Sequence, residues 1–173
     1  ENGMRYALQA NGRPEQEAVI RLTFRAGSKH EKDDTRGGAH FLEHMAFNGT
    51  ENVPEGEMVK SLERMGMSFG ADTNASTTYT RTDYRLNLPE VDEETVDYAL
   101  FLLRELSDKM LIEDAAVERE RGVVKAEEAR RRGPQFDASQ AFQKFVQPEA
   151  RSLQRPVAGT AESLDGITAA KLR

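Results

Sequence analysis

Two of the three histidines in this chain lie four positions apart, and a glutamate directly precedes the second, in the order His40, Glu43, His44. On a helix, residues at positions i, i+3 and i+4 lie on one face, so these side chains are expected to point into one small volume. A catalytic zinc takes three protein ligands and lowers the pKa of a water in the fourth position from about 15.7 to about 7. The histidines therefore predict two zinc ligands. Glu43, at the flank of the face, is expected to be the general base that deprotonates the water.

The order H-x-x-E-H matches the inverzincin pattern, which reverses the commoner H-E-x-x-H. Short motifs also arise by chance, so the surrounding residues matter. Gly37 and Gly38 precede the motif, where they suit the turn from a loop into a helix, and Leu42 and Met45 give that helix apolar surface to bury. Because histidines on a partly buried helix need polar partners or a metal, this context favours a metal site.

The third ligand is expected to be acidic, since the chain has no cysteine and its remaining histidine lies in a charged loop. The segment 117–130 predicts a helix on which Glu120 and Glu127, seven positions apart, share nearly the same azimuth at about 100° per residue. Val123 and Val124 lie between them and argue against full exposure of that face. The alternative is that both glutamates are solvated charges paired with Arg and Lys at helical spacing.

Three segments of the sequence share an ordered likeness with a known family. They are residues 37–50 (GGAHFLEHMAFNGT), the pair Asn74-Ala75, and residues 120–128 (ERGVVKAEE). On these motifs the chain resembles the pitrilysin (insulinase) family of zinc metallopeptidases, and within it the bacterial PqqL-like members. The resemblance extends over nearly the whole chain and implies one Zn²⁺ per chain.

The resemblance also implies roles for the two glutamates of the later helix. Glu127, the last glutamate of the E-R-x-V-V-x-x-E run, corresponds to the third zinc ligand. Glu120, the first glutamate of the run, then supports the site from outside the ligand set. Glu127 lies several residues further from His44 than the resemblance implies, which indicates a small insertion between them. Glu120 lies closer to the usual interval, and the two exchange roles if the motif alignment is wrong.

Asn74 and Ala75 lie in a region with β-branched and aromatic residues near a turn, which predicts strands. The resemblance implies that the strand after this pair is an exposed edge beside the zinc. Such an edge recognises an extended peptide through main-chain hydrogen bonds. Asn74 and Ala75 are therefore predicted to bind substrate. The alternative is an ordinary surface strand whose threonines face water.

The remaining pattern predicts an α+β fold, with a mainly antiparallel sheet and helices packed on one face, because strands and helices do not alternate regularly. The pitrilysin-family fold implied by the resemblance agrees with this. Strands are predicted at residues 4–9, 18–25, 67–74 and 79–88, and helices at 54–65, 93–110, 114–132 and 137–147, besides the zinc helix.

Composition narrows the function classes. At 173 residues with 38% hydrophobic and 31% charged side chains, the sequence fits one soluble domain over residues 1–173. The net charge of −6 gives no support for nucleic-acid binding. No apolar run reaches the length of a membrane span, and the absence of cysteine excludes disulfides and thiol nucleophiles. The chain opens without an initiator methionine, which indicates a processed or trimmed product.

The main hypothesis is therefore a zinc-dependent endopeptidase domain whose substrates are peptides or unfolded proteins. The resemblance implies an N-terminal, incomplete peptidase domain, with a homologous C-terminal partner domain that supplies an arginine and a tyrosine, and a location in the bacterial periplasm or another exported compartment. Two alternatives stay open. One is a non-catalytic peptide-binding or scaffold subunit of the same fold, and the other is a zinc hydrolase of a non-peptide substrate.

Overall fold

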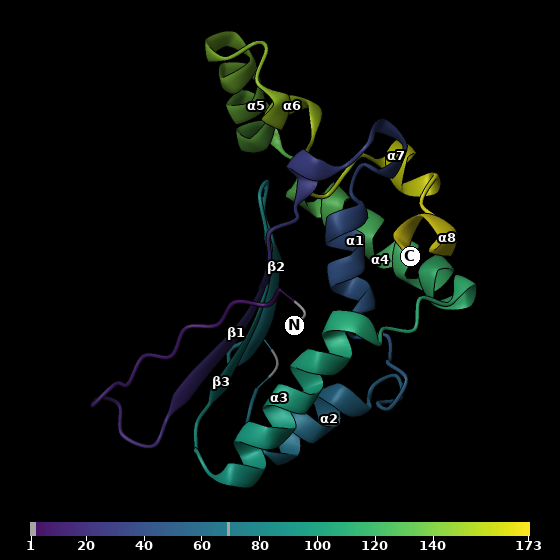
Figure 1. The fold of residues 1–173 in the computed structure, drawn as a ribbon. Coiled ribbons are helices and arrows are strands. Elements are labelled where there is room, and N and C mark those ends of the chain that lie inside the picture. The colour runs from purple at the N-terminus through teal and green to yellow at the C-terminus, as the bar shows by residue number, and fades with distance from the viewer. Residues whose placement is uncertain (1–2, 69) are drawn as a thin grey trace.

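The computed structural model describes residues 3–68 and 70–173. Three strands form an antiparallel sheet in the order β1-β3-β2, with β1 at Ala18–Phe24, β2 at Thr73–Thr77 and β3 at Thr82–Leu88. The helices that pack against this sheet lie on one of its faces (Figure 1). The predicted α+β class, with an antiparallel sheet covered on one face, is confirmed.

The strands form where apolar and polar residues alternate. In β1, Ile20 and Leu22 turn toward the helices while Arg21 between them is exposed. In β3, Tyr84 and Leu86 are buried, and they pair with Leu22 and Ile20 across the ladder. This period of two gives the sheet one buried face and one wet face.

The helices follow the predicted order, with bounds that shift by a few residues. The α-helices are α1 Gly38–Met45, α2 Glu57–Arg64, α3 Glu93–Asp108, α4 Asp114–Arg131, α5 Pro134–Val146, α6 Arg151–Gln154, α7 Ala161–Asp165 and α8 Ala169–Leu172. Two short 3-10 turns, η1 Ser28–His30 and η2 Asp33–Thr35, precede α1. The helix predicted from residue 137 begins earlier, because Pro134 is well suited to the first helical position.

Helix α1 lies between two hydrophobic cores. The larger core joins the inner face of the sheet to α2 and α3, and Ala46 contributes to it at the end of α1. The second core joins α1 to α4, α7 and α8, with Phe41 and Met45 facing Val117 and Val124. Because α1 is buried on both sides, its remaining side chains are held in fixed directions.

Two predicted strands are corrected. Residues 4–9 form no strand and lie outside the three-stranded sheet, and Tyr6 and Leu8 are exposed at 86% and 91%, so their apolar side chains are not buried in a core. The strand predicted at 67–74 lies at Thr73–Thr77 instead. Before it, the Asp72 carboxylate accepts a hydrogen bond from the Ser68 amide, which closes a turn. Phe69, part of that prediction, lies outside the described residues.

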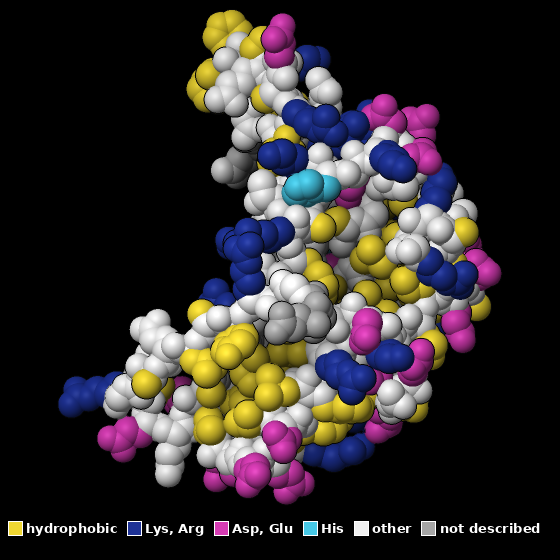
Figure 2. Space-filling view, in the orientation of Figure 1, with side chains coloured by type: hydrophobic (Ala, Val, Ile, Leu, Met, Phe, Trp, Pro, Cys, Tyr) yellow, Lys and Arg dark blue, Asp and Glu magenta, His cyan; other side chains and the backbone are white. Residues whose placement is uncertain are grey.

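Helix α5 projects from the body next to α6 (Figure 1). None of its residues is buried, and Phe142 and Phe145 are exposed at 68% and 85%. Hydrophobic side chains are visible over this projection and between the sheet and α3 in Figure 2. Among the described residues, no helix combines the length and the apolar character that crossing a membrane requires.

Candidate metal centre

The start of α1 directs the two histidines. Gly37 precedes the helix with a φ of 86°, a left-handed conformation that favours glycine, and a Cβ there would lie 3.0 Å from Gly159 Cα. The chain therefore turns sharply into α1 in close contact with a distant segment. Phe41 and Met45 then fix the buried side of the helix, and His40 and His44 project together from another side, with ring centroids 4.7 Å apart.

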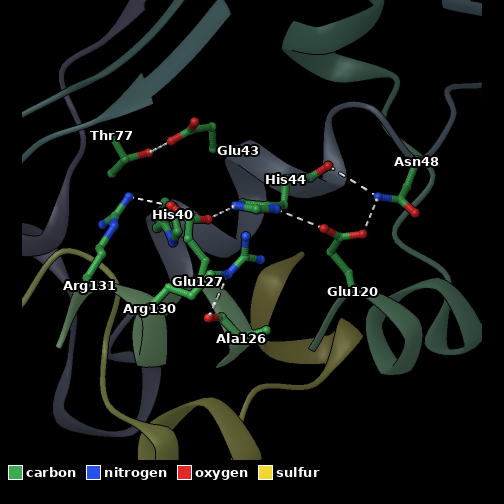
Figure 3. Close-up of polar contacts among 10 residues, drawn as sticks. All are labelled: His40, Glu43, His44, Asn48, Thr77, Glu120, Ala126, Glu127, Arg130 and Arg131. Carbon is green, nitrogen blue, oxygen red and sulfur yellow. Dashed lines mark hydrogen bonds and ion pairs between the residues drawn. The ribbon is translucent and has the colours of Figure 1, made fainter. Parts of the chain in front are cut away.

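Helix α4 brings a carboxylate to both rings (Figure 3). Glu127 Oε2 lies 3.1 Å from His44 Nε2 and 3.7 Å from His40 Nε2. Ligand atoms that bind one zinc tetrahedrally at about 2.0–2.2 Å lie about 3.4 Å from one another. The distances from the two histidines to Glu127 lie on either side of this value. His40, His44 and Glu127 thus form a three-residue group with the spacing of a metal site.

Glu120 contacts the opposite side of His44. Its Oε1 lies 2.8 Å from His44 Nδ1, and its Oε2 accepts a hydrogen bond of 3.1 Å from Asn48 Nδ2. Asn48 Nδ2 also donates to the backbone oxygen of His44 at 3.2 Å. A carboxylate on the far nitrogen of a histidine fixes the tautomer that leaves the other nitrogen free to bind a metal. The geometry therefore gives Glu127 and Glu120 different positions around His44, and their roles as ligand and supporting residue stay a prediction.

Glu43 points from the flank of α1 toward the sheet, where its carboxylate accepts a hydrogen bond from the hydroxyl of Thr77 at the end of β2 (Figure 3). It is not part of the three-residue metal group. Burial raises the pKa of Glu43, although the hydrogen bond from Thr77 acts in the opposite direction. A carboxylate with a raised pKa, close to the metal group but outside it, suits a general base.

The two histidines differ in electrostatic environment. Burial lowers the pKa of His40 from 6.5 to about 4, and the charge of His44 adds to the effect. Burial acts on His44 in the same direction, but the hydrogen bond and charge of Glu120, together with Glu127, raise the pKa of His44 above its ordinary 6.5. The hydrogen bond from His44 in turn lowers the pKa of Glu120. His40 is therefore neutral near pH 7, which is the form that binds a metal.

The residues of this group fit a zinc ion. His40 is 4% exposed, and the 3.7 Å between its Nε2 and Glu127 Oε2 is too long for a hydrogen bond but suits two ligands of one ion. Two imidazoles and one carboxylate are also a ligand set found in catalytic zinc sites. The assignment of these residues as ligands stays a prediction.

Within the described residues, strand β2 pairs with β3 alone and so forms an edge of the sheet. The Asn87 amide donates to the Asp72 backbone oxygen, and the Thr78 amide donates to the Arg81 backbone oxygen. In this register, the even-numbered residues of β2 form the backbone hydrogen bonds to β3. By the antiparallel alternation, the backbone N–H and C=O of Ala75 point toward the open edge. The side chain of Asn74 is exposed and bonds to the Gly70 oxygen. Substrate binding by Asn74 and Ala75 stays a prediction.

Several contacts of the site were not predicted from the sequence. Asn48 and Thr77 lie far in sequence from the carboxylates that they contact. Arg131 is bonded to the second oxygen of Glu127, four positions before it. This is the helical spacing at which the alternative interpretation expected the glutamates to pair with Arg or Lys, so for Glu127 that pairing is present beside the contacts with the histidines. The expectation that Val123 shares the sheltered face was wrong, because it is 49% exposed and only Val124 is buried.

Residues 6–155 match the family described as Insulinase (Peptidase family M16), so the chain belongs to that family. The family predicted from the motifs is confirmed. The chain is 33% identical over all of its 173 residues to the probable zinc protease PqqL of Escherichia coli (strain K12), of which it covers 19%. It is 40% identical over 133 residues, 77% of its length, to the probable zinc protease PqqL of Haemophilus influenzae, of which it covers 14%.

A solved structure agrees with these relatives. The first half of the periplasmic protease PqqL from Escherichia coli matches with a TM-score of 0.87 and 33% identity, over 92% of this chain and 34% of that one. The chain spans less than a fifth of the length of the two curated relatives. The matching family is described as a peptidase family, and the two relatives named above are described as probable zinc proteases.

Proposed function

We propose that this chain forms the zinc-binding part of a metalloendopeptidase that cleaves peptides or unfolded proteins. The observation that carries the proposal is the convergence of His40 Nε2, His44 Nε2 and Glu127 Oε2 on one point, with Glu43 beside it. We also propose that a further domain completes the catalytic chamber, and that the protein acts in the periplasm or another exported compartment. The solved relative from Escherichia coli is described as periplasmic.

His40, His44 and Glu127 would hold one zinc ion. When bound, zinc supplies Lewis acidity for a water and for the carbonyl group of the scissile peptide. Glu43 takes a proton from the attacking water and later returns it to the leaving nitrogen. Thr77 orients the Glu43 carboxylate through its hydroxyl, and Glu120 orients the His44 ring through Nδ1.

The open edge of β2 would hold the substrate. The outward N–H and C=O of Ala75 can each bond to the backbone of an extended peptide, which would be added to the sheet as a further strand. Thr77 lies two residues further along the same strand and contacts Glu43. A peptide on this edge would therefore lie beside the base. Recognition through main-chain atoms suits unfolded segments more than folded proteins.

The test combines metal analysis with turnover. The purified wild-type chain should contain one zinc per chain, and His44→Ala should lose it. In the full-length natural protein, Glu43→Gln should keep zinc but lower kcat on unstructured peptides by about 10²–10⁴-fold, the usual contribution of a general base. Glu63→Gln on the exposed side of α2 is the matched control and should change neither zinc content nor kcat.

The other outcomes separate the alternatives. An undiminished rate for Glu43→Gln would show that another group is the base. One zinc per chain without peptide cleavage by the full-length protein would favour a non-catalytic binding subunit. Hydrolysis of small amides without hydrolysis of peptides would favour a non-peptide substrate.

A further inference from the structure

We propose that Glu31 is a positioning residue, which fixes the first turn of α1 and thereby sets the places of His40 and His44. This inference rests on the proposed zinc site. The Glu31 carboxylate spans the start of the helix: its Oε2 accepts a hydrogen bond of 2.9 Å from the Gly37 amide, and its Oε1 accepts one of 2.9 Å from the Ala39 amide. The residue that contacts both amides thus lies well before the helix in sequence.

Helix α1 needs such a partner because it lacks an ordinary cap. The first amides of a helix have no acceptor within the helix, and a side chain at the N-cap position usually supplies one. Here the N-cap is Gly37, which has no side chain. Its φ of 86° favours glycine, and a Cβ at this position would lie 3.0 Å from Gly159 Cα. Glu31 replaces the missing cap, and its negative charge also complements the positive end of the helix dipole.

Glu31 is itself held in place. It is 8% exposed, and so is Arg155, whose guanidinium donates to the Glu31 backbone oxygen at 3.3 Å and to the Asp33 carboxylate at 2.6 Å. The Arg155 backbone oxygen accepts a hydrogen bond of 2.9 Å from the buried hydroxyl of Ser28. The loop that carries Glu31 is thus tied to a segment more than a hundred residues away. The carboxylate is therefore a fixed anchor for the helix and not a mobile surface group.

The position of this anchor matters for the metal group. His40 directly follows Ala39, so an amide that Glu31 holds lies next to the first of the proposed ligands. Ligands must be held within about 0.5 Å for a productive metal site. Loss of the contacts from Glu31 would free the amides of Gly37 and Ala39 and let the ring of His40 move relative to Glu127.

The experiment compares Glu31 with Asp92, since each is a carboxylate that accepts hydrogen bonds from amides at the start of a helix. Glu31→Gln keeps the shape of the side chain but turns an N–H group toward one of the two amides. Glu31→Asp keeps the charge but is one methylene shorter. The control is Asp92→Ala, because Asp92 Oδ1 accepts from the Thr95 amide at 2.7 Å and caps α3, which carries none of the proposed ligands. Zinc affinity is measured by competition with a chelator, amide exchange of residues 37–45 by mass spectrometry, and Tm by thermal unfolding of the metal-free chain.

We expect Glu31→Gln to weaken zinc binding by about tenfold or more, in the range known for residues that orient metal ligands, and to speed amide exchange at the start of α1. Glu31→Asp should do the same to a smaller degree. Asp92→Ala should lower Tm but leave zinc affinity within about twofold of wild type.

Zinc affinity of Glu31→Gln within about twofold of wild type would overturn the positioning role, and so would an equal loss of affinity in Asp92→Ala. If the wild-type chain bound no zinc, the proposed function would be wrong and the positioning role would fall with it. If wild type binds zinc and only the Glu31 comparison fails, the proposed function stands.

Discussion

The two glutamates of α4 provide the sharpest test of the metal centre, because they touch the same histidine from opposite sides. Glu127 Oε2 lies 3.1 Å from His44 Nε2 and 3.7 Å from His40 Nε2, whereas Glu120 contacts only His44 Nδ1, at 2.8 Å. Glu127→Gln should therefore remove a ligand, and Glu120→Gln should remove only the group that orients a ligand. The two variants change the same kind of side chain on the same helix.

The expected magnitudes differ. Four-ligand structural zinc sites bind with about 10–16 kcal/mol, which corresponds to about 2.5–4 kcal/mol per ligand and hence to roughly 70- to 900-fold in affinity. Residues that orient a ligand contribute about 10- to 100-fold. Glu127→Gln should thus weaken zinc binding by several hundredfold and Glu120→Gln by a few tens of fold.

The assay is zinc affinity by chelator competition on the purified chain, with Glu118→Gln as the control. Glu118 lies on the same helix, but its carboxylate is exposed and pairs with Arg121, so its variant should bind zinc as wild type does. A larger loss for Glu120→Gln than for Glu127→Gln would mean that the two residues exchange roles. Losses no larger than that of Glu118→Gln would refute the participation of both carboxylates.

Two further predictions concern the framework of the site. Gly37→Ala should lower the free energy of unfolding by about 1–3 kcal/mol in a denaturant titration, because residue 37 has a φ of 86° and a Cβ would lie 3.0 Å from Gly159 Cα. The control is Gly122→Ala, in open space within α4, which should raise the free energy of unfolding by about 0.5–1 kcal/mol. Equal effects of the two variants would contradict the strained conformation of residue 37. Burial opposes the ionisation of Glu105, but hydrogen bonds from Thr50 and Asn52 outweigh it and hold the pKa of Glu105 below its ordinary 4.5. The Glu105 carboxylate therefore stabilises the fold above about pH 4.5, and this contribution is lost as the pH falls through the folded-state pKa. Glu105→Gln should be less stable than wild type by about 2 kcal/mol at pH 7. The difference in Tm between the two should shrink below pH 4.5. A Tm difference that stays constant from pH 7 to pH 3 would rule out this account.

The parts of the site that follow helical spacing could be predicted from the sequence. His40, Glu43 and His44 lie on one short helix, and the seven-residue interval between Glu120 and Glu127 puts both on one side of another, so local geometry alone indicated where they point. The same reasoning failed for Val123, because neighbouring residues on a helix differ by about 100° in direction and only Val124 reaches the core.

Contacts between distant elements could not be predicted in this way. Thr77 donates to Glu43 on α1, and Asn48 donates to Glu120 on α4. The carboxylate that caps α1 belongs to Glu31, in the loop before that helix. Such pairs depend on how the elements pack and not on any spacing along the chain. The strand predicted at residues 4–9 failed for a related reason, because strand propensity depends on packing in a sheet and these residues lie outside it.

The proposed ligands come from helices that are anchored to different degrees. Helix α1 is fixed at its start by Glu31, near its end by Asn48, and along its sides by two cores, so His40 and His44 are held before any metal binds. Glu127 follows His44 by 83 positions and lies one turn from the end of α4, beyond Val124, the last residue of that helix in a core. A cation bound by all three would therefore tie the less anchored end of α4 to the rigid α1. The metal would then contribute to the fold at the point from which the exposed helix α5 departs.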